Sequence, residues 1–417
     1  MNKEEVLKKI LNCNKCGLCQ EVCPTYKISG HEFAVARGRL RLIRMALEGE
    51  LDLNGEPELE EFVNECLLCK ACEVNCPSFV PVSQIISEIR ENYTQVKGLP
   101  LTKRLMYRGV FSKNKNLNLI RKMALIYQGT GANRIVKGVK FLKKSPLNLL
   151  PKLTKKSVRE QLPEILKEIA NPKHRVAYFL GCSVNNFFSE IGVASIKVLQ
   201  ENNCQVVIPE VSCCGAPHKS AGDREETIRL AKINLRAFKD LDVEAIVVDC
   251  STCGSVLMEY AEILKDDQEY GELAQNIANL ITDISAYLVK IDFRKPEGQL
   301  PLVRVTYHDP CHGIRSLKVQ KEPRKILEAI PGVKLVEMRD AASCCGGAGS
   351  YSIFQAKTSK KVLKEKMANY QETEADILAT SCPACTMQLG YGIELANLSG
   401  VVKHPVELLA QAYEKEK

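Results

Sequence analysis

Two runs of cysteines near the N-terminus have the residue types and spacing needed to bind metal. The first run comprises Cys13, Cys16, Cys19, Cys23 and Pro24. The second run comprises Cys66, Cys69, Cys72, Cys76 and Pro77. Both follow C-x2-C-x2-C-x3-C-P, the spacing of bacterial iron–sulfur sites. Structural zinc sites use separated C-x2-C pairs instead. We therefore predict two cubane [4Fe–4S] clusters, which exchange single electrons.

The pairing of these cysteines follows a known precedent. In proteins with two such clusters, the fourth cysteine of each run binds the cluster of the other run. One cluster is therefore expected on Cys13, Cys16, Cys19 and Cys76. The other cluster is expected on Cys66, Cys69, Cys72 and Cys23.

A different cysteine pattern occurs twice in the C-terminal half. Its first copy comprises Cys182, Cys213, Cys214, Cys250 and Cys253. Its second copy comprises Cys311, Cys344, Cys345, Cys382 and Cys385. Matching positions lie 129 to 132 residues apart, and each vicinal pair is followed by a glycine, so the segment is duplicated.

Five sulfurs per copy exceed what a single tetrahedral zinc ion needs. A vicinal pair cannot easily give both sulfurs to one small ion, but it can span a larger cluster. We therefore predict an iron–sulfur cluster in each copy. Zinc remains the alternative in the first copy, and a redox-active dithiol remains an alternative in either. No catalytic residue is predicted.

The elements around these cysteines follow an α/β pattern. Short apolar runs end just before the cysteines, and amphipathic helical stretches such as 187–203 and 223–241 separate them. Alternating strands and helices indicate a parallel sheet in each copy, with the cysteines at its carboxyl edge. Cys253 and Cys385 should lie near the start of a helix, where thiolates are favoured.

The N-terminal part is expected to be α-rich, with helices at 38–50 and 57–69 and another that Pro81 starts or precedes. The predicted class is a multidomain α+β chain. Its segments are a ferredoxin-like domain with two [4Fe–4S] clusters (1–98), a basic helical connector (99–172), and two cysteine-rich α/β repeats (173–299 and 300–417).

The connector is strongly basic. Between Lys97 and Arg175 the chain has 20 Lys or Arg residues and three acids, and helices are expected at 104–129 and 133–150. We expect a connector with a solvated basic face. The alternatives are docking to an acidic partner or peripheral association with anionic lipid at the inner face of the cell membrane. Nucleic-acid binding is disfavoured because no recognition motif accompanies the charge.

The composition of the chain indicates its cellular compartment. The chain has 417 residues and 19 cysteines, most of them in tight groups. It shows no apolar signal region and no stretch long enough to span a membrane. Grouped cysteines in such a chain indicate metal sites rather than disulfides, so we expect a cytoplasmic protein. No G-x-G-x-x-G fingerprint for FAD or NAD is present, so a separate partner should handle hydride.

Several other residues could suggest a site. We expect Cys204, His218 and His404 to be structural. His308, Asp309 and His312 stand where the first copy has Phe179, Leu180 and Ser183, so they make the second copy more polar. They could tune that site or serve an acceptor, and the alternative is local hydrogen bonding.

The order of two ferredoxin runs and two C-C-G copies resembles the glycolate oxidase iron–sulfur subunit family. Its CCG domain is shared with heterodisulfide reductase subunits and with iron–sulfur subunits of lactate and anaerobic glycerol-3-phosphate dehydrogenases. The sequence CPTYKISGHEFAVARGRLRLIRMALEGE is similar to the glycolate oxidase type. The resemblance implies noncubane [4Fe–4S] clusters on the ten CCG cysteines.

The resemblance also implies a partner and a role. An FAD-binding subunit would oxidise glycolate or D-lactate, and this chain would pass the electrons to a quinone or another redox protein. We expect the cubanes to be carriers and the CCG sites, especially the second, to be where electrons enter or leave. The alternative is a heterodisulfide reductase-type subunit with disulfide chemistry at the CCG clusters. A regulatory iron or oxygen sensor is disfavoured because a sensor does not need two cubanes.

Overall fold

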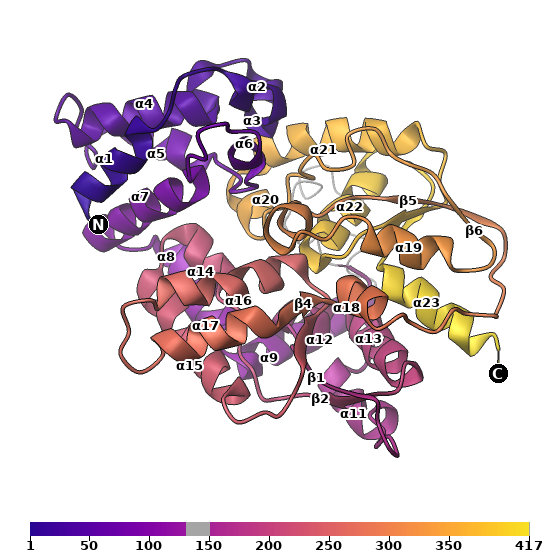
Figure 1. Cartoon of the computed structure of the whole chain (residues 1–417). Coiled ribbons are helices and arrows are strands. Elements are labelled where there is room, and N and C mark those ends of the chain that lie inside the picture. The colour runs from indigo at the N-terminus through magenta and orange to yellow at the C-terminus, as the bar shows by residue number, and fades with distance from the viewer. Residues whose placement is uncertain (131–150, 417) are drawn as a thin grey trace.

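The computed structural model describes residues 1–130 and 151–416. A helical N-terminal module lies beside two repeats, each of which combines helices with a parallel sheet (Figure 1). The predicted fold class is confirmed. The helix predicted at 133–150 lies outside the described residues.

The N-terminal module has a small apolar core. Its four longer helices are α1 (Lys3–Leu11), α4 (Ala36–Leu47), α5 (Pro57–Asn64) and α7 (Val82–Lys97). Val6, Ile43, Val63 and Ile85 are fully buried between them. Pro81 immediately precedes α7, as predicted, because proline suits a helix start. The shorter elements are α2 (Leu18–Val22), α3 (Pro24–Ser29), η1 (Glu32–Ala34) and α6 (Ala71–Val74).

The basic connector is helical where it is described. It contains α8 (Leu101–Arg104), the π-helix η2 (Leu105–Phe111), α9 (Asn114–Gly129) and α11 (Val158–Ile165). Arg121 is buried and pairs with Glu160 at 2.6 Å, and Arg108 donates two hydrogen bonds to Asp223. Part of the basic charge therefore stabilises the interior instead of forming a solvated face. Within the described ranges, no helix is long and apolar enough to cross a membrane.

The first repeat contains a four-stranded parallel sheet in the order β2-β1-β3-β4. Its strands are β1 (His174–Tyr178), β2 (Cys204–Val207), β3 (Ala245–Val248) and β4 (Ile281–Asp283). Its helices are α12 (Cys182–Phe187), α13 (Ser189–Glu201), α14 (Ala216–Ala221), α15 (Arg224–Phe238), α16 (Ser251–Ile263), α17 (Gly271–Leu280) and α18 (Ile284–Lys290).

The second repeat has the same topology, with the sheet order β6-β5-β7-β8. Its strands are β5 (Val303–Tyr307), β6 (Val333–Leu335), β7 (Ile377–Ala379) and β8 (Val401–Lys403). Its helices are η5 (Gly313–Leu317), α19 (Glu322–Glu328), α20 (Tyr351–Phe354), α21 (Ala356–Gln371), α22 (Pro383–Leu395) and α23 (Pro405–Glu414).

The two repeats pack reciprocally. Helix α13 of the first repeat packs against α23 of the second, and α18 of the first packs against α19 of the second. In each repeat, α13 or α19 lies between the first two strands in sequence, and α18 or α23 follows the fourth. Equivalent helices thus make equivalent contacts, as in a two-fold symmetric dimer. Two apolar cores, one on each face of the sheets, both contain residues of both repeats.

The N-terminal module is held to both repeats by long basic side chains. Lys70 Nζ donates to Glu259 Oε1 of the first repeat at 2.7 Å. Arg315 of the second repeat donates to the carbonyl oxygen of Cys69 at 2.9 Å. These contacts place the second cysteine run against both repeats instead of leaving a separate, tethered domain.

The contact between α7 and the first repeat can be tested at Gly222. Its φ is +79°, and an added Cβ would lie 2.3 Å from the carbonyl oxygen of Arg90. We expect Gly222→Ala to lower the free energy of unfolding for two reasons. The left-handed conformation costs about 1–2 kcal/mol, and the overpacked contact costs about 1–3 kcal/mol more.

Gly30→Ala is the matched control for this prediction. Gly30 has φ +70°, but an added Cβ would meet no atom within 4 Å. Denaturant unfolding of the anaerobically purified variants should therefore show the larger loss in Gly222→Ala. Equal losses in the two variants would contradict the close contact between α7 and the first repeat.

Candidate metal centres

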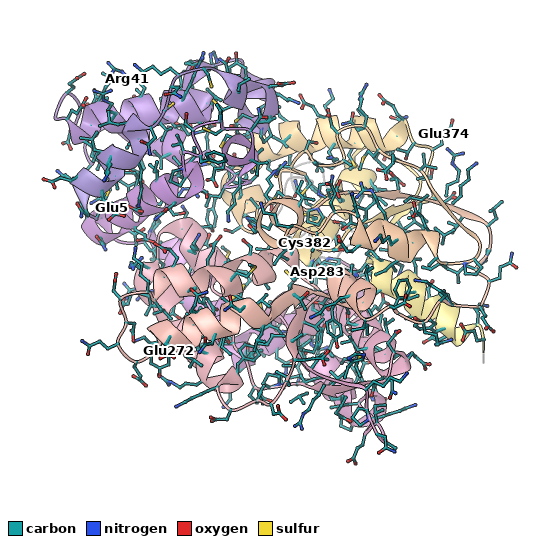
Figure 2. All side chains as sticks on the ribbon, viewed as in Figure 1. Glu5, Arg41, Glu272, Asp283, Glu374 and Cys382 are labelled. Atoms are coloured by element: carbon teal, nitrogen blue, oxygen red, sulfur yellow. The ribbon has the colours of Figure 1, made fainter. Side chains whose placement is uncertain are left out.

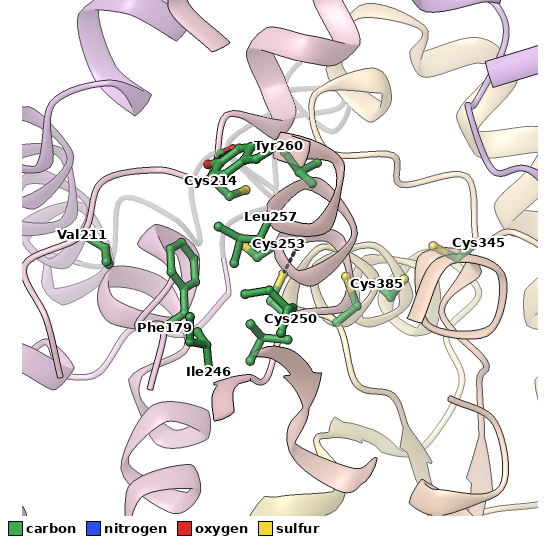
Figure 3. Close-up of a cluster of buried hydrophobic side chains, with 14 of the residues drawn as sticks. Phe179, Val211, Cys214, Ile246, Cys250, Cys253, Leu257, Tyr260, Cys345 and Cys385 are labelled. Atoms are coloured by element: carbon green, nitrogen blue, oxygen red, sulfur yellow. Dashed lines mark hydrogen bonds between the residues drawn. The ribbon is translucent and has the colours of Figure 1, made fainter. Parts of the chain in front are cut away.

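The strand ends bring the five cysteines of the first repeat to one edge of its sheet. Cys182 begins α12 after β1, Cys213 and Cys214 follow β2, and Cys250 caps α16 after β3. Carboxyl ends of parallel strands share an edge, so these residues converge. The Cys253 N–H donates to Cys250 Sγ at 3.4 Å (Figure 3).

The second repeat repeats this arrangement. Cys311 follows β5, the vicinal pair follows β6, and Cys382 caps α22 after β7. The glycine after each vicinal pair has a left-handed conformation, with φ +87° at Gly215 and +81° at Gly346. Its N–H donates to the first sulfur of the pair, at 3.5 Å to Cys213 and 3.4 Å to Cys344.

The two sets of cysteines meet at Cys250 and Cys382, which are equivalent residues of the two repeats. Both residues are buried in one cluster, and the neighbouring Cys250 thiol holds the pKa of Cys382 well below its usual range. Thr252 Oγ1 lies 3.3 Å from the same sulfur. Figure 3 shows the labelled cysteines extending from Cys214 past Cys250 to Cys345. In Figure 2, Cys382 lies in the interior between the repeats.

Neighbouring thiols favour deprotonation at one position in each set. The Cys182 thiol lowers the pKa of Cys213 well below its usual range. Cys311 does the same for Cys344. Metals bind the thiolate form and release its proton, so these arrangements suit a metal centre.

The spacing of possible ligand atoms differs between the two repeats. Ligands of one zinc ion lie close together because the Zn–S distance is about 2.3 Å. In the described part of the chain, one group of three ligating atoms lies within 4.8 Å of one another, and it comprises His308, Cys345 and Cys385. No such group of three is found among the described residues of the first repeat.

In both N-terminal runs, the residues on either side of the second cysteine have a left-handed backbone conformation. Lys15 and Gly17 flank Cys16 with φ +57° and +88°, and the residues that flank Cys69 have φ +53° and +59°. Successive N–H groups in such turns form concave nests, which are common at iron–sulfur sites.

The runs also approach each other at their ends. Four cysteines taken from both runs line a single cavity, namely Cys23, Cys66, Cys69 and Cys72. At the other end, Asn75 Nδ2 donates to the Leu18 carbonyl at 2.7 Å, which holds the residue before Cys76 next to the first run. This is the grouping that the crossed pairing requires.

The second run lies directly against the second repeat. Cys69 and Cys344 belong to one buried cluster together with Leu67 and Tyr351. Burial, followed by the proximity of Cys344, raises the pKa of Cys69 to about 12. The cysteine sets therefore follow the order first run, second run, second repeat, first repeat. Of the 19 cysteines, all within the described ranges, only Cys16 is exposed.

Three residues that we expected to be structural have structural contacts. Cys204 is fully buried in β2. His404 caps α23 and accepts from the Val406 N–H at 3.2 Å. His218 lies between Ser112 Oγ at 3.0 Å and a carboxylate oxygen of Asp223 at 3.2 Å.

The three polar residues of the second copy differ in their surroundings. Asp309 accepts two hydrogen bonds from Arg324, at 2.8 and 3.0 Å. His312 lies 3.3 Å from Thr252 Oγ1. Only His308 joins the cysteines directly. Lys366 is also buried beside this site, and the sequence reasoning missed it because a lysine on an amphipathic helix usually faces solvent.

Comparison with known proteins supports the cysteine motifs. A 4Fe–4S dicluster domain matches residues 9–80, and the cysteine-rich CCG domain matches residues 176–258 and 305–390. One subunit of the fumarate reductase (CoM/CoB) of Methanothermobacter marburgensis is 34% identical over 247 residues, covering 58% of this chain and 47% of that protein. A crystal structure of a hypothetical protein from Helicobacter pylori shares the fold, with TM-score 0.51 at 10% identity over 99% of this chain and 77% of that chain.

One relative matches nearly from end to end. The probable glycolate oxidase iron–sulfur subunit of Bacillus subtilis is 36% identical over 419 residues, covering 97% of this chain and 94% of that protein. The resemblance that the motifs indicated is therefore confirmed, and the chain belongs to the family of glycolate oxidase iron–sulfur subunits.

Proposed function

We propose that this chain is the iron–sulfur electron-transfer subunit of an FAD-dependent 2-hydroxyacid dehydrogenase complex of the glycolate or D-lactate type. The observation that carries the proposal is the continuous row of cysteines, which contains all 19 except Cys204 and has exposed Cys16 at its outer end. Membership of the glycolate oxidase family supports the substrate class.

The proposed ligand sets follow this row. Two cubane clusters take Cys13, Cys16, Cys19 and Cys76, and then Cys66, Cys69, Cys72 and Cys23. Two noncubane clusters take the five cysteines of the second repeat and the five of the first, with zinc as the alternative in the first repeat. When bound, these clusters would supply one-electron exchange.

The protein's own contribution is to hold adjacent cysteine sets in contact and to exclude water. The second run touches the second repeat at Cys69 and Cys344, and the repeats touch each other at Cys250 and Cys382. All four residues are buried. Fixed, dry contacts between centres suit rapid electron exchange.

A separate flavoprotein completes the proposal. The sequence lacks a dinucleotide-binding fingerprint, so the two-electron oxidation of the hydroxyacid is assigned to an FAD-binding partner. A quinone or a second redox protein would accept the electrons.

A second candidate function is reductive cleavage of a disulfide at the CCG sites. The Methanothermobacter relative favours it, because the name of that enzyme associates it with CoM and CoB. Cys182 and Cys311 also remain half-buried, whereas the other CCG cysteines are buried.

Reconstitution with the flavoprotein tests the main proposal. We expect the anaerobically purified chain to bind an FAD-dependent 2-hydroxyacid dehydrogenase subunit. Addition of glycolate or D-lactate should then bleach the visible absorbance of the clusters as they are reduced. The chain without the flavoprotein is the control and should stay oxidised. The proposal would be contradicted if the chain did not bind the flavoprotein, or if the complex showed no substrate-dependent bleaching. Disulfide cleavage by the chain alone with a reduced dye would favour the second candidate instead.

Paired cysteine substitutions test the crossed ligand sets. Cys23→Ser should remove one cluster. Adding Cys69→Ser should remove little more iron, because the two residues serve the same cluster, whereas adding Cys13→Ser should remove a second cluster. Iron and sulfide analysis measures the outcome. If the Cys23→Ser, Cys13→Ser double variant loses no more iron than either single variant, the two residues bind the same cluster and the pairing is uncrossed.

A further inference from the structure

Phe179 and His308 occupy equivalent positions in the two repeats. Each residue follows the tyrosine that ends the first strand of its repeat. The Phe179 N–H donates to the Val247 carbonyl at 3.0 Å, and the His308 N–H donates to the Ala379 carbonyl at 2.8 Å. The backbone is thus conserved between the repeats, and only the side chain differs.

The two side chains provide different surroundings for their cysteines. Phe179 is buried in the apolar core that also contains Cys214 and Cys253, and Figure 3 shows it on the first-repeat side of that core. His308 is fully buried, and its ligating nitrogen lies within 4.8 Å of the Cys345 and Cys385 sulfurs.

The His308 ring is not committed elsewhere. Neither ring nitrogen makes a hydrogen bond to any residue that the structure describes. The neighbouring Ala341 carbonyl already accepts from the Asp309 N–H at 3.1 Å and from Lys366 Nζ at 3.3 Å. In either neutral tautomer the imidazole ring carries one N–H donor. An unpaired buried donor is unfavourable, which favours a partner within the site.

A second difference between the repeats is the buried ammonium of Lys366. This side chain is 1% exposed and donates to the carbonyls of Asp340 and Ala341, at 2.6 and 3.3 Å. No carboxylate pairs with it among the described residues. Burial lowers the pKa of Lys366, and the nearby Cys345 and Cys344 sulfurs oppose that shift, which places the amine beside the vicinal pair.

The first repeat has a neutral amide in the place of Lys366. Buried positions of α21 and α15 match at a spacing of 132 residues, as Met367 matches Leu235 and Tyr370 matches Phe238. The same spacing aligns Lys366 with Asn234. Asn234 donates to the Cys213 carbonyl at 3.1 Å and carries no charge.

A third difference also places a positive charge beside the cysteines of the second repeat. Arg315 stands four residues after Cys311, and Asn186 stands four residues after Cys182. The Arg315 guanidinium lies close enough to Cys311 to oppose the rise in the pKa of that thiol. Asn186 only donates to the carbonyl of Cys182 at 2.9 Å.

These differences have an electrostatic consequence. Reduction adds one negative charge to a centre. A nearby cation and an N–H donor stabilise that charge, most strongly in a buried site, and thereby raise the reduction potential. We propose that His308 and Lys366 make the centre of the second repeat easier to reduce than the centre of the first repeat. This inference rests on the proposed function, which places an iron–sulfur centre in each repeat.

Substitution by the residues of the first repeat tests the proposal in the full-length protein. His308→Phe and Lys366→Asn should each lower the midpoint potential of one CCG signal in an EPR-monitored redox titration. The other CCG signal and the cubane signals should stay in place, and the double variant should bring the two CCG potentials closer together. Lys366→Arg keeps the charge and should restore most of the potential. Lys364→Asn, on an exposed position of the same helix, is the control and should shift nothing.

Isotope labelling provides a measurement that needs no destabilising variant. Protein produced with 15N-labelled histidine should show a changed nitrogen coupling in the EPR signal of the higher-potential CCG centre. The His308→Phe variant should lack this coupling. Equal potentials for the two CCG centres in the unsubstituted protein, or unchanged potentials in both variants at full iron content, would overturn the inference. Iron sufficient for only the two cubanes, with no CCG signal, would instead overturn the cofactor assignment of the proposed function, and the inference with it.

Discussion

The contact between Cys250 and Cys382 is the constraint on which the rest of the structure depends. Equivalent residues of two repeats can touch only at a pseudo-two-fold axis, so both sheets must present their carboxyl edges to one seam. The reciprocal packing of α13 with α23 and of α18 with α19 holds the sheets in that position. Because both apolar cores contain residues of both repeats, the seam cannot open without exposing both cores.

The N-terminal module breaks this symmetry. It packs against the first repeat through α7 and α14, but its second cysteine run meets only the cysteines of the second repeat. The second repeat therefore lies between the second run and the first repeat in the row of cysteine sets. The exposed end of the row is the first run, at Cys16.

Much of this arrangement could be predicted from the sequence because it is local. Apolar runs before cysteines indicated β1, β2, β3 and their counterparts, and the period of the duplication related the two sites. The fourth strands, β4 and β8, were missed because three residues carry no measurable alternation. The order of the sites also could not be predicted from the sequence. It depends on contacts such as that between Arg315 and Cys69, which are 246 residues apart.

Duplication by itself produces two equal sulfur sites, and a few substitutions beside them are enough to make the sites unequal. Burying Lys366 without a carboxylate partner is costly unless anionic sulfur offsets its charge. The ammonium group and nearby thiolates would therefore stabilise each other, in addition to the effect of the Asp340 and Asp309 carboxylates. Such coupling is reciprocal, so the lysine that would raise the potential of the second site should also favour its metal-bound, negatively charged state. In this repeat, holding a cluster and tuning it are the same electrostatic interaction.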